Sequence, residues 1–225
     1  MESGILSVVA TPIGNLEDMT HRAIRILKEA DYILCEDTRV TKKLCQHYEI
    51  DTQLKRYDAH TSEASHESIL GDLEARKHIA LVSDAGTPGV SDPGVLLVAR
   101  ARKAGARIEV VPGPSAVTAA VSLAGLSGNQ FTFLGFSPQK KGRETFFKNL
   151  SSYEHPVVFF ESTHRILKAL DALSEFLPTV PVLLMRELTK LHEETLSGTA
   201  DELKALLEAE SVKQKGEFVI IVDPR

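Results

Sequence analysis

Three segments of the sequence place carboxylates and cations together directly after short apolar runs. They are Glu36-Asp37-Thr38-Arg39, Glu161-Ser162-Thr163-His164-Arg165 and Arg186-Glu187-Leu188-Thr189-Lys190. Polar groups at the end of a buried strand are candidates for function, because a carboxylate can accept a proton and a nearby cation can stabilise an anion. The simpler alternatives are that Asp37 or Thr38 caps the following helix, and that the charged residues form a structural ion-pair network.

A glycine-rich stretch from Val82 to Gly94, VSDAGTPGVSDPG, ends the apolar run Ile79–Val82. Its glycines and prolines predict a turn whose main-chain N–H and C=O groups can approach a small ligand, at the strand end where α/β sheets bind ligands. Asp92 and Pro93 are expected to start the next helix as its N-cap and first residue. The stretch from Val110 to Ala116, VVPGPSA, repeats the pattern, so the two turns could wall one pocket. Either turn can also be a plain connection from strand to helix.

The elements that must position these groups alternate between strand and helix in the first half of the chain. Strands are expected at residues 5–10, 32–35, 54–57, 79–82 and 107–111. Helices are expected between them, at residues 16–30, 40–48, 63–77 and 93–104. This alternation predicts a mostly parallel sheet.

Strands follow one another more closely in the second half, which fits a mixed or antiparallel sheet. They are expected at residues 131–134, 157–160, 182–185, 192–197 and 217–222. Helices are expected at residues 115–124 and 144–150, and a third begins with the capping box of Thr199 and Glu202. We expect two α/β domains, residues 1–113 and 114–225.

The composition is that of a globular protein, with 43% hydrophobic and 25% charged residues in a chain of 225. No apolar run approaches the roughly 18 residues of a membrane span, and Met1 to Gly4 lack the basic region of a signal peptide. A cytoplasmic protein is therefore expected, with Cys35 and Cys45 as reduced structural thiols. The net charge of −5 argues against wholesale coating of a nucleic acid, so any polyanion must meet local basic patches.

Several common sites are excluded by residue type. The sequence contains neither a GxGxxG dinucleotide pattern nor a P-loop, and it narrowly misses the GxSxG of serine hydrolases at 89–93 and at 113–117. His60, His66 and His78 lack the spacing of metal ligands. We expect these histidines to be exposed to solvent, and we expect no metal.

Seven segments, in order along nearly the whole chain, match one known family. They are TPIGNL at 11–16, EDTR at 36–39, SDAGTPGVSDPG at 83–94, VPGPSA at 111–116, FESTHR at 160–165, RELTK at 186–190 and KGEF at 215–218. Together they resemble the small-subunit ribosomal RNA methyltransferase branch of the tetrapyrrole methylase superfamily, the class III S-adenosylmethionine methyltransferases. The glycine/proline turns are shared by the superfamily, whereas EDTR and RELTK point to the RNA branch.

The resemblance implies 2'-O-methylation of a cytidine ribose in the decoding region of 16S ribosomal RNA. It also implies a homodimer whose chain holds S-adenosylmethionine in a cleft between two α/β domains, with a parallel-rich N-terminal sheet and a mixed C-terminal sheet. The residues expected to bind the cofactor, largely through the main chain, are Pro12, Gly86, Thr87, Gly89, Val90, Ser91, Ser115, Ala116, Phe160 and Gly216.

The sequence departs from the family pattern in three places. Thr87 stands where the superfamily usually has an acidic residue, and the asparagine expected beside His60 is missing. The sequence also ends at Arg225, where many relatives carry a short C-terminal extension that we expect to help hold RNA.

Methyl transfer to a ribose hydroxyl needs a base for the hydroxyl proton and benefits from a cation near the developing oxyanion. We assign Asp37 or Glu187 as the carboxylate and Arg39 or Lys190 as the cation. Contacts to RNA phosphates are expected from Lys140, Lys141 and Arg143, with further contacts from Lys42, Lys43, Lys55 and Arg56, and Phe136 is expected to stack on an unpaired base.

Two other functions compete with RNA methylation. One is methylation of a tetrapyrrole or another small molecule, which the acidic pI of about 5.9 favours. The other is a non-catalytic, ribosome-associated module that binds the cofactor.

Overall fold

The computed structural model describes residues 4–126 and 128–225. Met1 to Ser3, which form part of the segment tested above for a signal peptide, lie outside the described residues, as does Ser127. The chain divides into two compact units, Met1–Ser115 and Ala116–Arg225, and the predicted boundary lies after residue 113.

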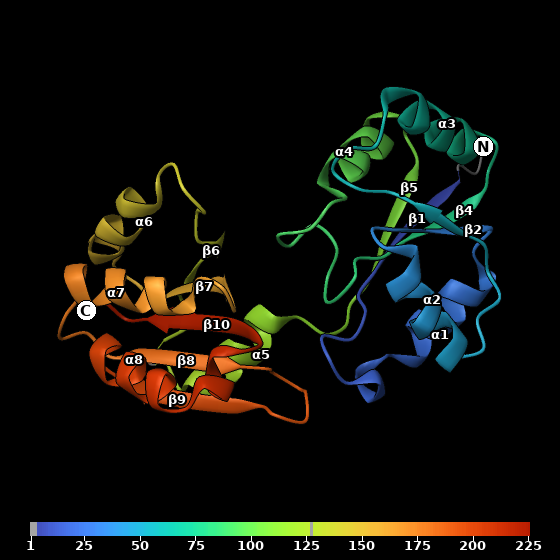
Figure 1. Cartoon of the computed structure of the whole chain (residues 1–225). Coiled ribbons are helices and arrows are strands. Elements are labelled where there is room, and N and C mark those ends of the chain that lie inside the picture. The colour runs from blue at the N-terminus through green and yellow to red at the C-terminus, as the bar shows by residue number, and fades with distance from the viewer. Residues whose placement is uncertain (1–3, 127) are drawn as a thin grey trace. The chain divides into compact units, whose positions relative to one another are not determined.

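The first unit is a parallel five-stranded sheet with a pair of helices on each face (Figure 1). In spatial order the strands are β3 (Leu54–Arg56), β2 (Tyr32–Cys35), β4 (His78–Leu81), β1 (Ile5–Val9) and β5 (Arg107–Val111). Helices α1 (His21–Glu29) and α2 (Thr38–His47) cover one face, and α3 (Glu63–Glu74) and α4 (Val95–Lys103) cover the other. The parallel sheet predicted from the alternation of elements is confirmed.

Strand β2 shows why a central strand of this sheet is a continuous apolar run. Ile33 and Cys35 contribute to the core beneath α1 and α2, whereas Tyr32 and Leu34 contribute to the core beneath α3 and α4. All four side chains are buried. A strand with a helix layer on each side buries both of its faces, so the alternation of apolar and polar residues disappears.

The neighbouring strands β1 and β4 send their following helices to opposite faces of the sheet. Helix α1 follows β1 and packs with the first core, whereas α4 follows β4 and packs with the second. Adjacent strands with this arrangement form a topological switch point. In α/β sheets, ligands bind at the carboxyl ends of the strands at such a point.

The second unit is a mixed sheet, which confirms the predicted type. In spatial order its strands are β6 (Thr132–Phe136), β7 (Val157–Ser162), β10 (Glu217–Val222), β8 (Val182–Arg186) and β9 (Glu194–Gly198). Strand β6 runs parallel to β7, and the other three pairs are antiparallel. Because β10 runs antiparallel between β7 and β8, the carboxyl ends of β6, β7 and β8 share one edge with the amino end of β10.

Three helices cover one face of this sheet around Phe147, Phe159 and Phe218. They are α6 (Arg143–Asn149), α7 (Ile166–Phe176) and α8 (Ala200–Ala209), and α5 (Ala116–Ala124) packs against β10. The predicted capping box of α8 is present. Short 3-10 turns occur at Leu16–Asp18, Leu150–Ser152 and Ser211–Gln214.

Two predicted helix starts are wrong. The helix expected from residue 16 begins at His21, because Thr20 is extended and its hydroxyl accepts the N–H of Ala23 as an N-cap. Helix α4 begins at Val95 instead of Pro93, with Gly94 as N-cap at a φ of 129° and no capping side chain. Gly94 is required because a Cβ there would lie 2.9 Å from a methyl group of Leu81.

The prediction of solvent exposure is wrong for two of the three histidines. His60 is exposed, but His66 lies on the inner side of α3, 4% exposed, with Nε2 3.1 Å from the hydroxyl of Tyr57. His78 is half-buried, and its Nε2 lies 2.8 Å from Oγ of Ser7. His66 is therefore part of the packed interior, and His78 is held by its side-chain contact with Ser7.

Candidate active site

The loops that follow β1, β4 and β5 are joined at the switch point of the first unit. Thr11 and Gly86 form an antiparallel bridge with N···O distances of 2.9 and 3.0 Å. The hydroxyl of Thr87 donates to the carbonyl of Pro114 at 3.1 Å. These contacts bring together the three segments that contain the predicted cofactor residues of this unit: Pro12, Gly86, Thr87, Gly89, Val90, Ser91 and Ser115.

The turn after β4 leaves main-chain donors unused. Gly86, Gly89 and Ser91 all have positive φ, at 78°, 82° and 67°. The N–H groups of Thr87, Gly89 and Ser91 donate to no other residue that the structure describes. A Cβ at Gly86 would lie 3.3 Å from a methyl group of Ile13, so a larger residue fits poorly. Free N–H groups on a turn that requires glycine can donate hydrogen bonds to the polar groups of a bound ligand.

Asp37 and Arg39 are bound to each other at the end of β2. Asp37 is the N-cap of α2 and accepts the N–H of Arg39 at 2.8 Å, and the Arg39 guanidinium approaches its other carboxylate oxygen at 2.6 Å. The hydrogen bonds from the Arg39 side chain and backbone lower the pKa of Asp37. The capping role considered from the sequence is therefore present, and a lowered pKa makes this carboxylate a weaker proton acceptor.

Glu36 and Asp92 also follow strands of the first sheet, but their pKa values are raised instead of lowered. Burial and the neighbouring carboxylates Asp84 and Asp58 raise the pKa of Glu36. Burial, followed by Glu36 and Asp84, raises the pKa of Asp92 to about 6. A base works best when its pKa is near the working pH, so these two carboxylates suit proton transfer better than Asp37. Sequence reasoning did not assign them, although both stand inside the recognised motifs.

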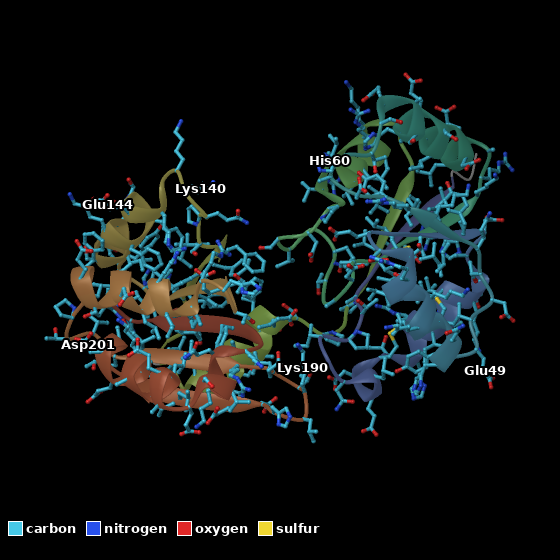
Figure 2. All side chains as sticks on the ribbon, viewed as in Figure 1. Glu49, His60, Lys140, Glu144, Lys190 and Asp201 are labelled. Atoms are coloured by element: carbon cyan, nitrogen blue, oxygen red, sulfur yellow. The ribbon has the colours of Figure 1, made fainter. Side chains whose placement is uncertain are left out.

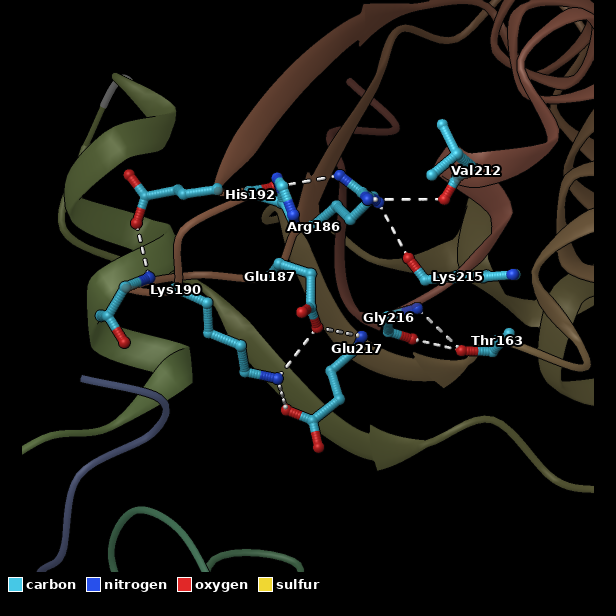
Figure 3. Close-up of polar contacts among 11 residues, drawn as sticks. Thr163, Arg186, Glu187, Lys190, His192, Val212, Lys215, Gly216 and Glu217 are labelled. Carbon is cyan, nitrogen blue, oxygen red and sulfur yellow. Dashed lines mark hydrogen bonds and ion pairs between the residues drawn. The ribbon is translucent and has the colours of Figure 1, made fainter. Parts of the chain in front are cut away.

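Glu187 and Lys190 form an ion pair at the shared edge of the second unit (Figure 3). Oε1 of Glu187 accepts hydrogen bonds from Nζ of Lys190 and from the N–H of Glu217, each at 2.9 Å. Nζ of Lys190 also reaches the Glu217 carboxylate at 3.0 Å. Burial opposes the ionisation of Glu187, but the Lys190 and Glu217 hydrogen bonds outweigh it and lower its pKa. Burial likewise opposes the charge of Lys190, but the two carboxylates raise its pKa and keep it a cation.

Gly216 lets this ion pair form. Its φ is 120°, and a Cβ on it would lie 2.6 Å from Cγ of Glu187. The hydroxyl of Thr163 holds Gly216 from the other side, donating to its carbonyl at 2.6 Å and accepting its N–H at 2.9 Å (Figure 3). The structure thus gives this predicted cofactor residue a packing role against Glu187.

Backbone strain concentrates in the same motifs. Of the five described non-glycine residues with positive φ, three lie in them: Ser91, Glu187 and Thr189. Such conformations cost free energy and occur most often where function requires a particular geometry. The strain therefore points to the turn after β4 and the segment after β8 as functional.

Phe160 belongs to an aromatic group on one face of the second sheet. Its ring lies edge-on to those of Phe133 and Phe136, with centroids 5.0 and 5.3 Å apart. Residues three apart in a regular strand face opposite sides, but β6 carries an extra residue between Phe133 and Phe136. This bulge brings both rings to Phe160 and leaves 52% of Phe136 exposed. Ala116, the first residue of α5, is half-buried.

The predicted RNA contacts fall into two groups. Lys140 and Lys141 are exposed on the loop between β6 and α6, and Figure 2 shows Lys140 extending away from that loop. Arg143 instead turns inward, with Nη1 3.1 Å from the buried carboxylate of Glu161. In the first unit Lys42 and Lys43 are exposed on α2, whereas Lys55 and Arg56 are paired with Asp72 and Asp58, respectively.

Across residues 4–126 and 128–225, no helix is long and apolar enough to cross a lipid bilayer. Within the same ranges, no group of three or more histidine, cysteine or acidic side chains is arranged to hold a metal ion.

Relatives of this chain are methyltransferases by name. A protein of Halalkalibacterium halodurans is 45% identical over 99% of this chain and 76% of its own length, and one of Thermotoga maritima is 42% identical over 97% of this chain and 98% of its own. Both are called ribosomal RNA small subunit methyltransferase I.

Solved structures share the fold at low identity. Diphthine synthase matches with a TM-score of 0.72 at 15% identity, covering 97% of this chain and 89% of the other. The uroporphyrin-III-C-methyltransferase of Thermus thermophilus matches with a TM-score of 0.66 at 20% identity, covering 98% and 94%. The family model for tetrapyrrole (corrin/porphyrin) methylases covers residues 6–204. The chain therefore belongs to the tetrapyrrole methylase family, alongside relatives that carry the name ribosomal RNA small subunit methyltransferase I.

Proposed function

We propose that this protein uses S-adenosylmethionine to methylate ribosomal RNA of the small subunit, at the 2'-hydroxyl of a cytidine in the decoding region of the 16S molecule. Methylation of small-subunit ribosomal RNA is supported by the 41–45% identity, over nearly the whole chain, to proteins named ribosomal RNA small subunit methyltransferase I. The cytidine 2'-hydroxyl is proposed from the sequence motifs alone. We further propose that it acts in the cytoplasm as a homodimer.

Each unit contributes its own candidate cofactor residues. In the first unit the free N–H groups of Thr87, Gly89 and Ser91 are the principal candidates, with Pro12, Gly86, Val90 and Ser115 shaping the turn around them. In the second unit the candidates are Ala116, Phe160 and Gly216. When bound, the cofactor supplies a methyl group on a positively charged sulfur, so in-line positioning of the hydroxyl provides much of the rate, up to roughly 7–11 kcal/mol.

The hydroxyl proton must pass to a base as the new carbon–oxygen bond forms. Asp37 and Glu187 are our candidates from the sequence, and their ion pairs with Arg39 and Lys190 would place a cation beside the developing oxyanion. The same ion pairs lower the pKa of each carboxylate, which weakens it as an acceptor. Glu36 and Asp92, with raised pKa values, are therefore proposed as the alternative acceptors.

Methylation of a tetrapyrrole or another small molecule is the second candidate function. It is supported by the fold shared with proteins such as uroporphyrin-III-C-methyltransferase. The exposed Lys140 and Lys141 favour RNA over a small molecule, because exposed cations can neutralise the phosphates of a nucleic acid.

The test is transfer of label from S-adenosylmethionine to small ribosomal subunits, or to naked RNA, from a strain that lacks the modification. Label in a ribose at the decoding region supports the proposal. Label in a tetrapyrrole substrate but not in RNA would replace it with the second function. Cofactor binding without transfer to either would indicate a non-catalytic module.

A further inference from the structure

We propose that Glu161 is a positioning residue for RNA binding, because it holds the basic loop 137–142 in one conformation through two arginines. The inference rests on the proposed RNA substrate. It is supported by a fully buried carboxylate that binds both ends of the loop carrying Lys140 and Lys141. This carboxylate is not one of the candidate cofactor or acid–base residues.

Four residues donate to the Glu161 carboxylate, two from segment 137–143 and two from segment 162–165. Its side chain is 0% exposed. Oε1 accepts the N–H of Ser162 at 2.8 Å and lies 2.9 Å from Nη2 of Arg165. Oε2 accepts from Nη1 of Arg143 at 3.1 Å and from the hydroxyl of Ser137. Two guanidinium groups and a hydroxyl satisfy the charge, which a buried carboxylate requires.

The two arginines that bind Glu161 also bind residues of the loop. Nη1 of Arg143 also donates to the Ser137 hydroxyl at 2.7 Å and to the Pro138 carbonyl at 3.1 Å. Nη1 of Arg165 donates to the Ser137 carbonyl at 2.8 Å. The loop therefore begins and ends on residues that share one carboxylate, and Gly142 closes it with a φ of 83°.

Arg143 thus has a different task from the phosphate contact expected of it. Its side chain is 17% exposed, and its Nη2 is buried without a hydrogen-bond partner in the described part of the chain. The guanidinium also lies over the ring of Phe147, 4.9 Å from its centroid. A cation held in this way serves the loop and does not face a solvent-borne phosphate.

What the anchored loop presents is a pair of free cations. Lys140 and Lys141 are exposed, and neither ammonium group has an ion pair among the described residues. When the loop is already ordered before RNA binds, binding does not include the entropy cost of ordering the loop. Each lysine that neutralises a phosphate also adds about one unit to the slope of log affinity against log salt.

The test compares Glu161→Gln and the milder Ser137→Ala with the double variant Lys140→Ala/Lys141→Ala. In the full-length chain, both anchor variants are expected to speed trypsin cleavage after Lys140 and Lys141. They should raise KM for RNA by about tenfold with a much smaller change in kcat, because a disordered loop weakens binding and leaves the chemistry intact. The affinity for S-adenosylmethionine should stay within about twofold of wild type, because no predicted cofactor residue is altered. Adding Glu161→Gln to the double lysine variant should weaken RNA binding no further.

Glu202→Ala is the control, because it removes one half of the capping box of α8 in the same unit without touching the loop. If it raises KM for RNA as much as Glu161→Gln does, the effect is general destabilisation and the inference is overturned. Wild-type cleavage and wild-type KM in both anchor variants would overturn it as well. A wild-type protein that binds and methylates no RNA would instead overturn the proposed function, whatever the cleavage experiment shows.

Discussion

Replacing Gly216 tests the packing at the shared edge of the second unit. In Gly216→Ala the new Cβ would lie 2.6 Å from Cγ and 2.8 Å from Cδ and Oε1 of Glu187, well inside the roughly 3.5 Å at which carbon atoms normally touch. Glu187 cannot retreat without loosening the hydrogen bonds that Lys190 and the N–H of Glu217 make to its Oε1. Two costs therefore combine at this position.

The magnitude follows from those two costs. A side chain at a positive φ costs about 1–2 kcal/mol. Weakening one hydrogen bond to a charged group costs about 1.5–3 kcal/mol, which brings the expected loss for Gly216→Ala to about 2.5–5 kcal/mol. Gly105 provides the matched control, since its φ is 76° but nothing lies within 4 Å of the Cβ position. Gly105→Ala should therefore lose only about 1–2 kcal/mol.

The assay is urea unfolding followed by circular dichroism, because the chain contains no tryptophan. Hydrogen exchange of peptides from β10 assigns the loss to the second unit. The double variant Glu187→Ala/Gly216→Ala should cost less than the sum of the single variants, because the clash disappears with the carboxylate. Equal losses at Gly216 and Gly105, or strict additivity in the double variant, would refute the close approach as the reason for glycine.

Three further predictions concern charge. Asp92→Asn should match wild type near pH 4 and exceed its stability by about 1–2 kcal/mol at pH 7.5 in pH-dependent unfolding. The raised pKa of Asp92 means that its protonated form stabilises the fold below about pH 4 and that this contribution is lost as the pH rises through about 6, with solvent screening reducing the full effect. An unchanged pH profile would contradict this. Lys140→Glu/Lys141→Glu should weaken RNA binding at least tenfold while cofactor affinity is kept. The control Lys148→Glu/Lys168→Glu makes the same change in net charge at exposed positions of α6 and α7 and should not weaken RNA binding. Equal losses of RNA affinity in filter binding would rule out a local patch. If Asp37 or Glu187 accepts the proton, replacing that residue by alanine should lower kcat by about 10²–10⁴ with cofactor binding unchanged. Full turnover by both Asp37→Ala and Glu187→Ala would indicate that Glu36 or Asp92 is the acceptor.

The order and type of the main elements follow from local patterns in the sequence. Apolar runs such as Tyr32–Cys35 and residues 157–160 form strands, and the polar or turn-forming residues that flank them make the signal local. The motif residues were likewise predicted to stand at strand ends, and Glu36, Glu161 and Glu187 do. Helix starts were less accurate, because one side chain, such as the Thr20 hydroxyl, decides where the backbone turns.

The tertiary structure alone decided which charged groups meet. Glu161 binds Arg143, 18 positions away, because β6 lies beside β7, and Glu187 meets Gly216 and Glu217 because β10 runs between β7 and β8. The raised pKa of Asp92 and the burial of His66 depend in the same way on residues distant in the chain. The sequence by itself determined which residue types are available and where the strands end. Pairing, burial and pKa depend on strand order in space, which no local pattern encodes.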